Sequence, residues 1–225
     1  MDKVLVEVCT GSLEGARIAE LSGADRIELN TALELDGLTP SAGLVQLVTR
    51  ELRIPVIAMA RPRAGDFCYT DDEWQTLRAD VQWLLANGVD GIAFGCLDSN
   101  GQVDLERCLE IRDLAGSHQL VFHKAFDDAV DWERGLESLV EAGINRVMTS
   151  GQSDTVMNGL ETLSSMVRQA GKRIEILPAG RVGSGNASQI VEKTGCNQLH
   201  GSFASSETLN LGDEIRSTIE QLARF

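Results

Sequence analysis

The sequence predicts a single (β/α)8 barrel that spans residues 1–225. Eight short apolar runs alternate with longer segments of helical period, a pattern typical of βαβ units that form a parallel sheet. The length of 225 residues suits one parallel barrel, because such domains run to about 200–250 residues. No Ser/Gly/Pro-rich linker interrupts the alternation. Eight βα units in this length favour a closed barrel over an open doubly wound sheet.

Each expected strand is a short run rich in Val, Ile, Leu or Phe and bounded by turn residues. In the first half of the chain the runs are Val4–Val8, Arg26–Leu29, Pro55–Met59 and Gly91–Phe94. In the second half they are Leu120–Phe122, Arg146–Thr149, Ile174–Leu177 and Gln198–His200. The segment after each run is long enough for a helix, so we expect one helix to follow each strand.

A recurring tripeptide supports the barrel. Glycine, a small or apolar residue, then Asp or Asn occurs at 23–25, 88–90, 143–145 and 195–197. Each copy lies where a helix should end and a strand begin, a position at which glycine tolerates the left-handed conformation. The copies precede the second, fourth, sixth and eighth strands, as expected for a barrel of two-strand repeats. Their spacing makes Glu28, Ala93, Met148 and His200 equivalent, with Asn30, Gly95, Ser150 and Ser202 two residues further on.

Charge and cysteine content narrow the classes of function. A net charge of −14 argues against nucleic-acid binding, which depends on clustered Lys and Arg. No run of about 18 apolar residues and no signal peptide is present, so we expect a cytoplasmic protein without a membrane segment. Five cysteines lie far apart without a C-x-x-C pair, which argues against a disulfide framework and a structural zinc site.

Polar residues gather where the strands should end, and barrel enzymes carry their chemistry at that face. Barrel closure makes the eighth, first and second strands neighbours, so His200, Glu7 and Glu28 should lie close together. Two carboxylates and an imidazole suit general acid–base chemistry or metal ligation. The alternative is an ion-pair network with Arg26 or Arg61. Arg61 and His123, after the third and fifth strands, are further candidates for the same face.

A glycine-rich loop, residues 179–186, follows the seventh expected strand. Loops after the seventh and eighth strands form the recurrent phosphate site of these barrels. Gly180 and Arg181 in the first loop and Gly201 and Ser202 in the second are therefore candidates to hold a phosphate or carboxylate. The alternative is that the glycines serve only the turns.

Residues 61–69, with the sequence RPRAGDFCY, resemble the R-P-R-G-G-D-F-x-Y signature of the CutC copper-homeostasis family. The likeness covers nearly the whole chain and includes residues 7–9, 23–29, 37–41, 122–127 and 149–152. The resemblance implies a TIM barrel, a homodimer and Cu(I) bound through cysteines near the ends of the first two strands. Cys9 matches the first of these positions, whereas Asn30 stands where relatives have the second cysteine.

Two hypotheses about function follow. The resemblance implies a cytoplasmic copper-handling protein with Cys9 as the chief Cu(I) ligand, assisted by His200, His123 or another cysteine, because Cu(I) prefers soft ligands. The polar strand ends instead suggest an enzyme that acts on a small anionic or phosphorylated metabolite. In that case Glu7 or Glu28 transfers a proton, and Arg61 and Arg181 bind the anion.

Overall fold

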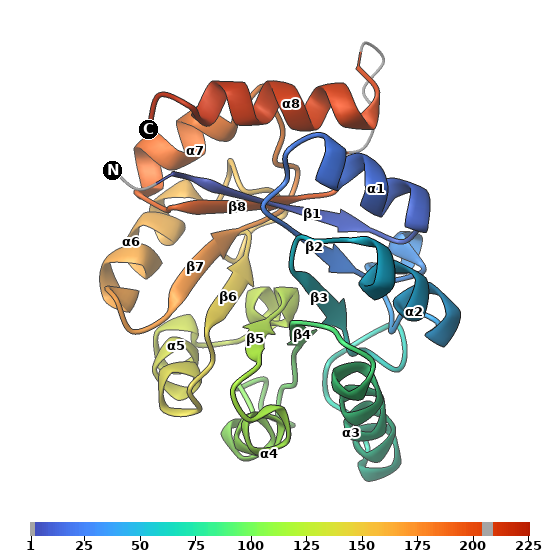
Figure 1. Ribbon diagram of the computed structural model, residues 1–225. Helices are drawn as coiled ribbons and strands as arrows, with labels where there is room; N and C mark the ends of the chain where they lie inside the picture. Colours follow the sequence, from blue (N-terminus) through green and yellow to red (C-terminus); the bar gives the residue numbers. More distant parts are fainter. Residues whose placement is uncertain (1–2, 204–208) are drawn as a thin grey trace.

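Eight parallel strands form the wall of a barrel in the computed structural model, which describes residues 3–203 and 209–225 (Figure 1). The strands are β1 (Leu5–Thr10), β2 (Arg26–Leu29), β3 (Val56–Met59), β4 (Gly91–Phe94), β5 (Gln119–Phe122), β6 (Arg146–Thr149), β7 (Glu175–Pro178) and β8 (Gln198–Gly201). Their order along the sheet is β7-β6-β5-β4-β3-β2-β1-β8. β7 and β8 lie side by side, although no strand ladder joins them in the described part of the chain. The predicted (β/α)8 barrel is confirmed.

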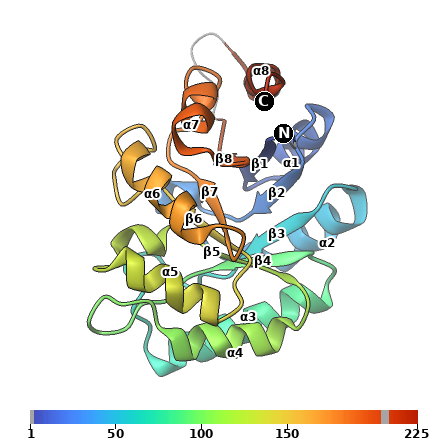
Figure 2. The same ribbon diagram turned by 90° about the vertical axis from the view of Figure 1, so that its left-hand side faces the viewer.

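The helices surround the strands (Figures 1 and 2). They are α1 (Leu13–Leu21), α2 (Ala42–Glu51), α3 (Asp71–Ala86), α4 (Leu105–Ala115), α5 (Trp132–Glu141), α6 (Leu160–Ala170), α7 (Ala187–Thr194) and α8 (Leu211–Leu222). Two 3₁₀ helices, η1 (Leu33–Leu35) and η2 (Lys124–Asp128), lie in the loops after β2 and β5. Most of the α-helices begin at a Ser, Thr, Asp or Asn whose side chain accepts a hydrogen bond from the first turn, as Thr70 does before α3. None of the helices in residues 3–203 and 209–225 is long and apolar enough to span a bilayer.

In three of its four copies, the recurring tripeptide joins an even strand to the strand before it. All four glycines have positive φ, between 68° and 92°, so the left-handed turn expected from the sequence is present. The acidic or amide side chain two residues after the glycine accepts a hydrogen bond from a backbone N–H of the preceding odd strand. Asp25 accepts from Val6, Asp90 from Val56 and Asn145 from Leu120. These bonds fix where neighbouring strands start and therefore which side chains share a level.

The interior of the barrel is divided into an apolar and a polar side. One large apolar cluster packs the strands against the helices. A separate smaller cluster comes from β3 to β7 and the residue after β7, and consists of Ile57, Met59, Ala93, Val121, Met148, Leu177 and Ala179. On β8, β1 and β2 the buried apolar side chains alternate with buried polar ones, among them Gln198, His200, Glu7, Arg26 and Glu28. The fold therefore concentrates charge on three adjoining strands.

Candidate functional site

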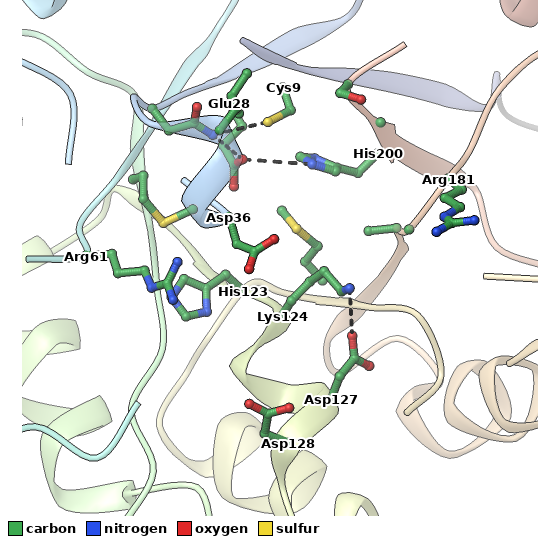
Figure 3. Close-up of a pocket in the computed structure, with 18 of the residues that line it drawn as sticks. Cys9, Glu28, Asp36, Arg61, His123, Lys124, Asp127, Asp128, Arg181 and His200 are labelled. Atoms are coloured by element: carbon green, nitrogen blue, oxygen red, sulfur yellow. Dashed lines mark hydrogen bonds and ion pairs between the residues drawn. The ribbon is translucent and has the colours of Figure 1, made fainter. Parts of the chain in front are cut away.

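A cavity of about 760 Å³ opens at the carboxyl ends of the strands (Figure 3). Its volume lies in the range of about 300–1,000 Å³ found for small-molecule sites. The residues named from the sequence that line it are Cys9, Glu28, Arg61, His123, Gly180, Arg181, His200, Gly201 and Ser202. Strands far apart in sequence thus contribute to one cavity, at the end of the barrel that the sequence indicated.

Three side chains converge on one wall of the cavity. A ligand atom from each of Cys9, Glu28 and His200 lies within 4.8 Å of the other two. His200 Nε2 and Glu28 Oε2 are 3.9 Å apart. Glu28 and His200 are almost completely buried, and Cys9 is partly buried. We refer to Cys9, Glu28 and His200 as the Cys9 centre. Parallel pairing produces it, because Cys9 lies opposite Glu28 and His200 lies opposite Glu7 in the strand register.

Glu7 differs from the expectation, because it does not line the cavity. It precedes Cys9 by two residues on the same face of β1, so it lies one level deeper in the barrel, and its exposed fraction is 0%. Its carboxylate forms an ion pair with Arg26 and lies 2.7 Å from His200 Nδ1. Glu7 therefore lies behind His200 and is not among the residues that line the cavity. Glu7 instead orients His200 so that Nε2 faces Glu28.

The electrostatics of the Cys9 centre keep His200 charged. Burial acts to lower the pKa of His200, but Glu28, Cys9 and Glu7 together raise it well above its ordinary value. Burial raises the pKa of Glu28, while His200 opposes this shift. Burial and the neighbouring Glu28 likewise raise the pKa of the Cys9 thiol. A cation bound between these groups would take over the charge that the imidazolium proton supplies.

Asn30 lies directly against the Cys9 centre. Its amide Nδ2 donates to Cys9 Sγ and to Glu28 Oε2, both at 3.1 Å. The position at which relatives carry a second cysteine is therefore within bonding reach of the first thiol. Glu28 Oε1 is buried and has no hydrogen-bond partner among the described residues.

Arg61 and His123 lie on a different part of the cavity wall (Figure 3). The Arg61 guanidinium donates to the backbone carbonyls of Leu35, Gly37 and Gly65. His123 Nδ1 accepts a hydrogen bond from the Ala125 N–H. Burial, together with the charge of Arg61, lowers the pKa of His123 to about 3, so its imidazole is neutral at physiological pH.

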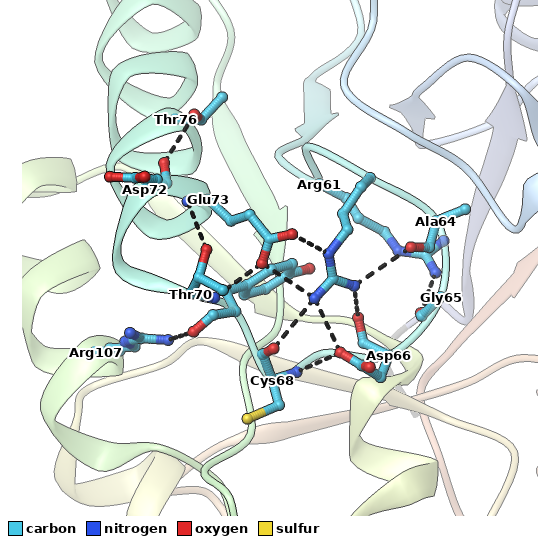
Figure 4. Close-up of polar contacts among 12 residues, drawn as sticks. Arg61, Ala64, Gly65, Asp66, Cys68, Thr70, Asp72, Glu73, Thr76 and Arg107 are labelled. Carbon is cyan, nitrogen blue, oxygen red and sulfur yellow. Dashed lines mark hydrogen bonds and ion pairs between the residues drawn. The ribbon is translucent and has the colours of Figure 1, made fainter.

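The second arginine of the RPR motif has a structural role. Arg63 forms ion pairs with Glu73 at 2.6 Å and Asp66 at 3.0 Å, and it donates to the Cys68 carbonyl. Glu73 also completes a capping box with Thr70 at the start of α3 (Figure 4). Arg63 therefore fastens the loop after β3 to α3, and it does not line the cavity.

The phosphate site expected in the loop after β7 is partly occupied by a side chain of the protein itself. Glu214 of α8 accepts hydrogen bonds from the backbone N–H and the hydroxyl of Ser184. The anion at the N-terminal side of α7 is thus an internal carboxylate, whereas the expected residues Gly180, Arg181, Gly201 and Ser202 line the cavity. Gly180 has φ of +100°, and a Cβ there would meet Ser150 at 3.1 Å, so the alternative that glycine serves the turn applies to it. The Arg181 side chain still lines the cavity.

Several residues that line the cavity were not identified as site residues from the sequence, and Asp36, Phe67 and Asp127 are among them. Asp36 reaches the cavity from the loop that contains η1, and it immediately precedes the recognised segment 37–41 without belonging to it. Phe67 belongs to the recognised motif, and its ring lies against Arg61 and His123. Asp127 also lines the cavity, but it accepts hydrogen bonds from Thr149, Ser150 and Gln152 and so holds the loop after β6.

The Glu7 carboxylate makes stability depend on pH. Burial alone would raise the pKa of Glu7, but Arg26 and His200 lower it from 4.5 to about 2. Its contribution is therefore fully present above pH 4.5 and is lost as the pH falls toward 2. We expect the urea midpoint of the wild type to fall more steeply over this interval than that of Glu7→Gln. Equal slopes in urea unfolding at stepped pH would contradict this assignment.

Comparison with known proteins identifies the family. The CutC family model matches residues 4–205. A family protein CutC of Treponema denticola is 44% identical over 200 residues, which cover 89% of this chain and 81% of that protein. The human copper homeostasis protein cutC homolog is 39% identical over 202 residues, covering 90% of this chain and 74% of that protein.

Comparison with solved structures supports the same fold and family. The crystal structure of CutC from Streptococcus agalactiae has a TM-score of 0.85 at 30% identity and covers 88% of this chain and 98% of that chain. Phosphoribosylanthranilate isomerase of Thermotoga maritima, at 12% identity and a TM-score of 0.60, shares the fold alone. The chain belongs to the CutC family.

Proposed function

We propose that this protein takes part in copper homeostasis by binding Cu(I) at the Cys9 centre. The convergence of a thiol, an imidazole and a carboxylate within 4.8 Å of one another carries the proposal. Two ligands of one ion at bond lengths of about 2.0–2.3 Å lie up to about 4.5 Å apart, so the observed spacing needs little adjustment. The copper-homeostasis names of the relatives favour this function over the metabolite enzyme.

The donor set suits a soft cation. A thiolate and an imidazole are preferred by Cu(I), whereas a carboxylate alone suits harder ions. Cys9 and His200 would therefore be the principal ligands, with Glu28 compensating charge. Glu7 would hold His200 Nδ1, as a carboxylate often does behind a metal-bound histidine, and leave Nε2 for the metal.

The state of the thiols supports a reducing location. All five cysteines are free, and three of them are buried. Free thiols are typical of the cytoplasm, where glutathione and thioredoxin keep them reduced. We therefore place the proposed Cu(I) binding in the cytoplasm.

An anaerobic Cu(I) titration against the chromophoric chelator bathocuproine disulfonate tests the proposal. We expect one equivalent of Cu(I) per chain and, for Cys9→Ser, at least about a tenfold loss of affinity, or 1.4 kcal/mol. Cys68→Ser is the matched control, because Cys68 is exposed and does not line the cavity. Wild-type affinity in Cys9→Ser, or an equal loss in Cys68→Ser, would refute Cu(I) binding at this centre.

A further inference from the structure

The cavity wall also carries a buried cation without a negative partner. Arg61 is 3% exposed, and its guanidinium contacts three backbone carbonyls. In residues 3–203 and 209–225 no carboxylate oxygen comes within 4.0 Å of it, although Asp36 and Asp128 line the same cavity. A buried charge that lacks a counter-charge is costly. Arg61 therefore lines the cavity without an ion-pair partner in the described chain, and its charge acts on the Asp128 carboxyl only at longer range.

Two hydrogen-bond donors remain unused beside this charge. His123 Nδ1 accepts from Ala125, so the proton of the neutral ring is on Nε2. Neither His123 Nε2 nor Arg61 Nε has a partner within the described chain. His123 is 3% exposed, like Arg61. Buried donors without acceptors are uncommon in native proteins and call for an explanation.

One aromatic ring links these two groups. The Phe67 ring lies 4.9 Å from the Arg61 guanidinium carbon and 5.0 Å from the His123 ring centre. Phe67 also lines the cavity and is itself partly exposed. The backbone carbonyls and the ring hold both donors in fixed positions.

We propose that Arg61 and His123 bind the carboxylate group of a small organic anion inside this cavity. A carboxylate supplies one negative charge for Arg61 and two oxygen atoms for the two unused donors. A phosphate dianion fits less well, because Asp36, Asp127 and Asp128 line the same cavity and the Lys124 ammonium is already 3.7 Å from Asp127. This site uses none of the residues of the Cys9 centre and goes beyond copper binding.

Succinate and its uncharged diamide, succinamide, are the probes. Metal-free protein is titrated with each by isothermal calorimetry, and thermal unfolding is followed in parallel. We expect succinate to bind and to raise Tm with concentration, whereas succinamide does neither. Arg61→Met and His123→Phe should each raise the Kd for succinate at least tenfold. His123→Phe keeps a ring packed against Phe67, so we expect this variant to fold. It therefore tests the proposal on its own if Arg61→Met does not fold.

Arg63→Met is the matched control, since it disturbs the same loop but does not remove a cavity charge. It should bind succinate as the wild type does. The proposal is overturned if both test variants keep wild-type affinity, if Arg63→Met loses as much, or if succinamide binds equally. Stabilisation by inorganic phosphate but not succinate would overturn the carboxylate assignment. Because no metal is present and Cys9→Ser should bind succinate normally, failure of copper binding leaves this result unaffected.

Discussion

We expect Asn30→Cys to tighten Cu(I) binding by about a hundredfold, or 2.7 kcal/mol. The Asn30 amide nitrogen is 3.1 Å from Cys9 Sγ, so a cysteine in its place would bring a second thiolate to the same ion. Cu(I) prefers two soft thiolates over one thiolate beside an amide. The substitution also supplies the second cysteine that the family resemblance implies at this position.

Competition with bathocuproine disulfonate measures the change. Asn30→Ala is the control, because it removes the two hydrogen bonds of the amide without adding a thiolate. If Asn30→Ala tightened binding as much as Asn30→Cys, release of the Cys9 thiol from the amide would be the cause. Unchanged affinity in Asn30→Cys would mean that the metal does not bind between β1 and β2.

We expect Arg26→Met to destabilise the protein by about 3–5 kcal/mol, the cost of removing one partner of a buried ion pair. The Arg26 and Glu7 side chains are 7% and 1% exposed, and Arg26 also donates to Gln198. Without Arg26 the Glu7 carboxylate would lose its ion pair and keep His200 beside it, with the Arg146 charge at longer range. Such a loss is a large share of the 5–15 kcal/mol by which domains are usually stable.

Urea unfolding at pH 7 gives the free energy of unfolding directly. Arg173→Met is the control: its ion pair with Glu137 is about half exposed, so solvent screens it and its loss should change the free energy of unfolding little. The double substitution Arg26→Met and Glu7→Leu should recover part of the loss, because it removes both charges together. If Arg26→Met lowered the free energy of unfolding no more than Arg173→Met does, the buried ion pair would not be needed for stability.

Much of the site could be predicted from the sequence, because the βα units of the barrel repeat the same geometry. Strand alternation and the recurring tripeptide placed Glu28 and His200 at equivalent positions, and both line the cavity. The expected closeness of Glu7 to His200 is confirmed by their 2.7 Å contact, but Glu7 lies one level deeper than the cavity lining, since a two-residue step along a strand changes the depth of a side chain. Depth follows from the stagger of the strands, which the apolar pattern alone does not specify.

The sequence by itself determined the barrel, the family and the end of the barrel at which polar groups gather, because these follow from local periodicity and from motifs. Only the tertiary structure decided which polar groups meet. The Glu214 carboxylate of α8 binds Ser184, thirty residues earlier, in the loop where we expected an anion to bind. Arg61 lines the cavity, whereas Arg63 pairs with Glu73 of α3. Such pairings depend on contacts between segments far apart in the chain, and those contacts exist only once the ring of strands has closed.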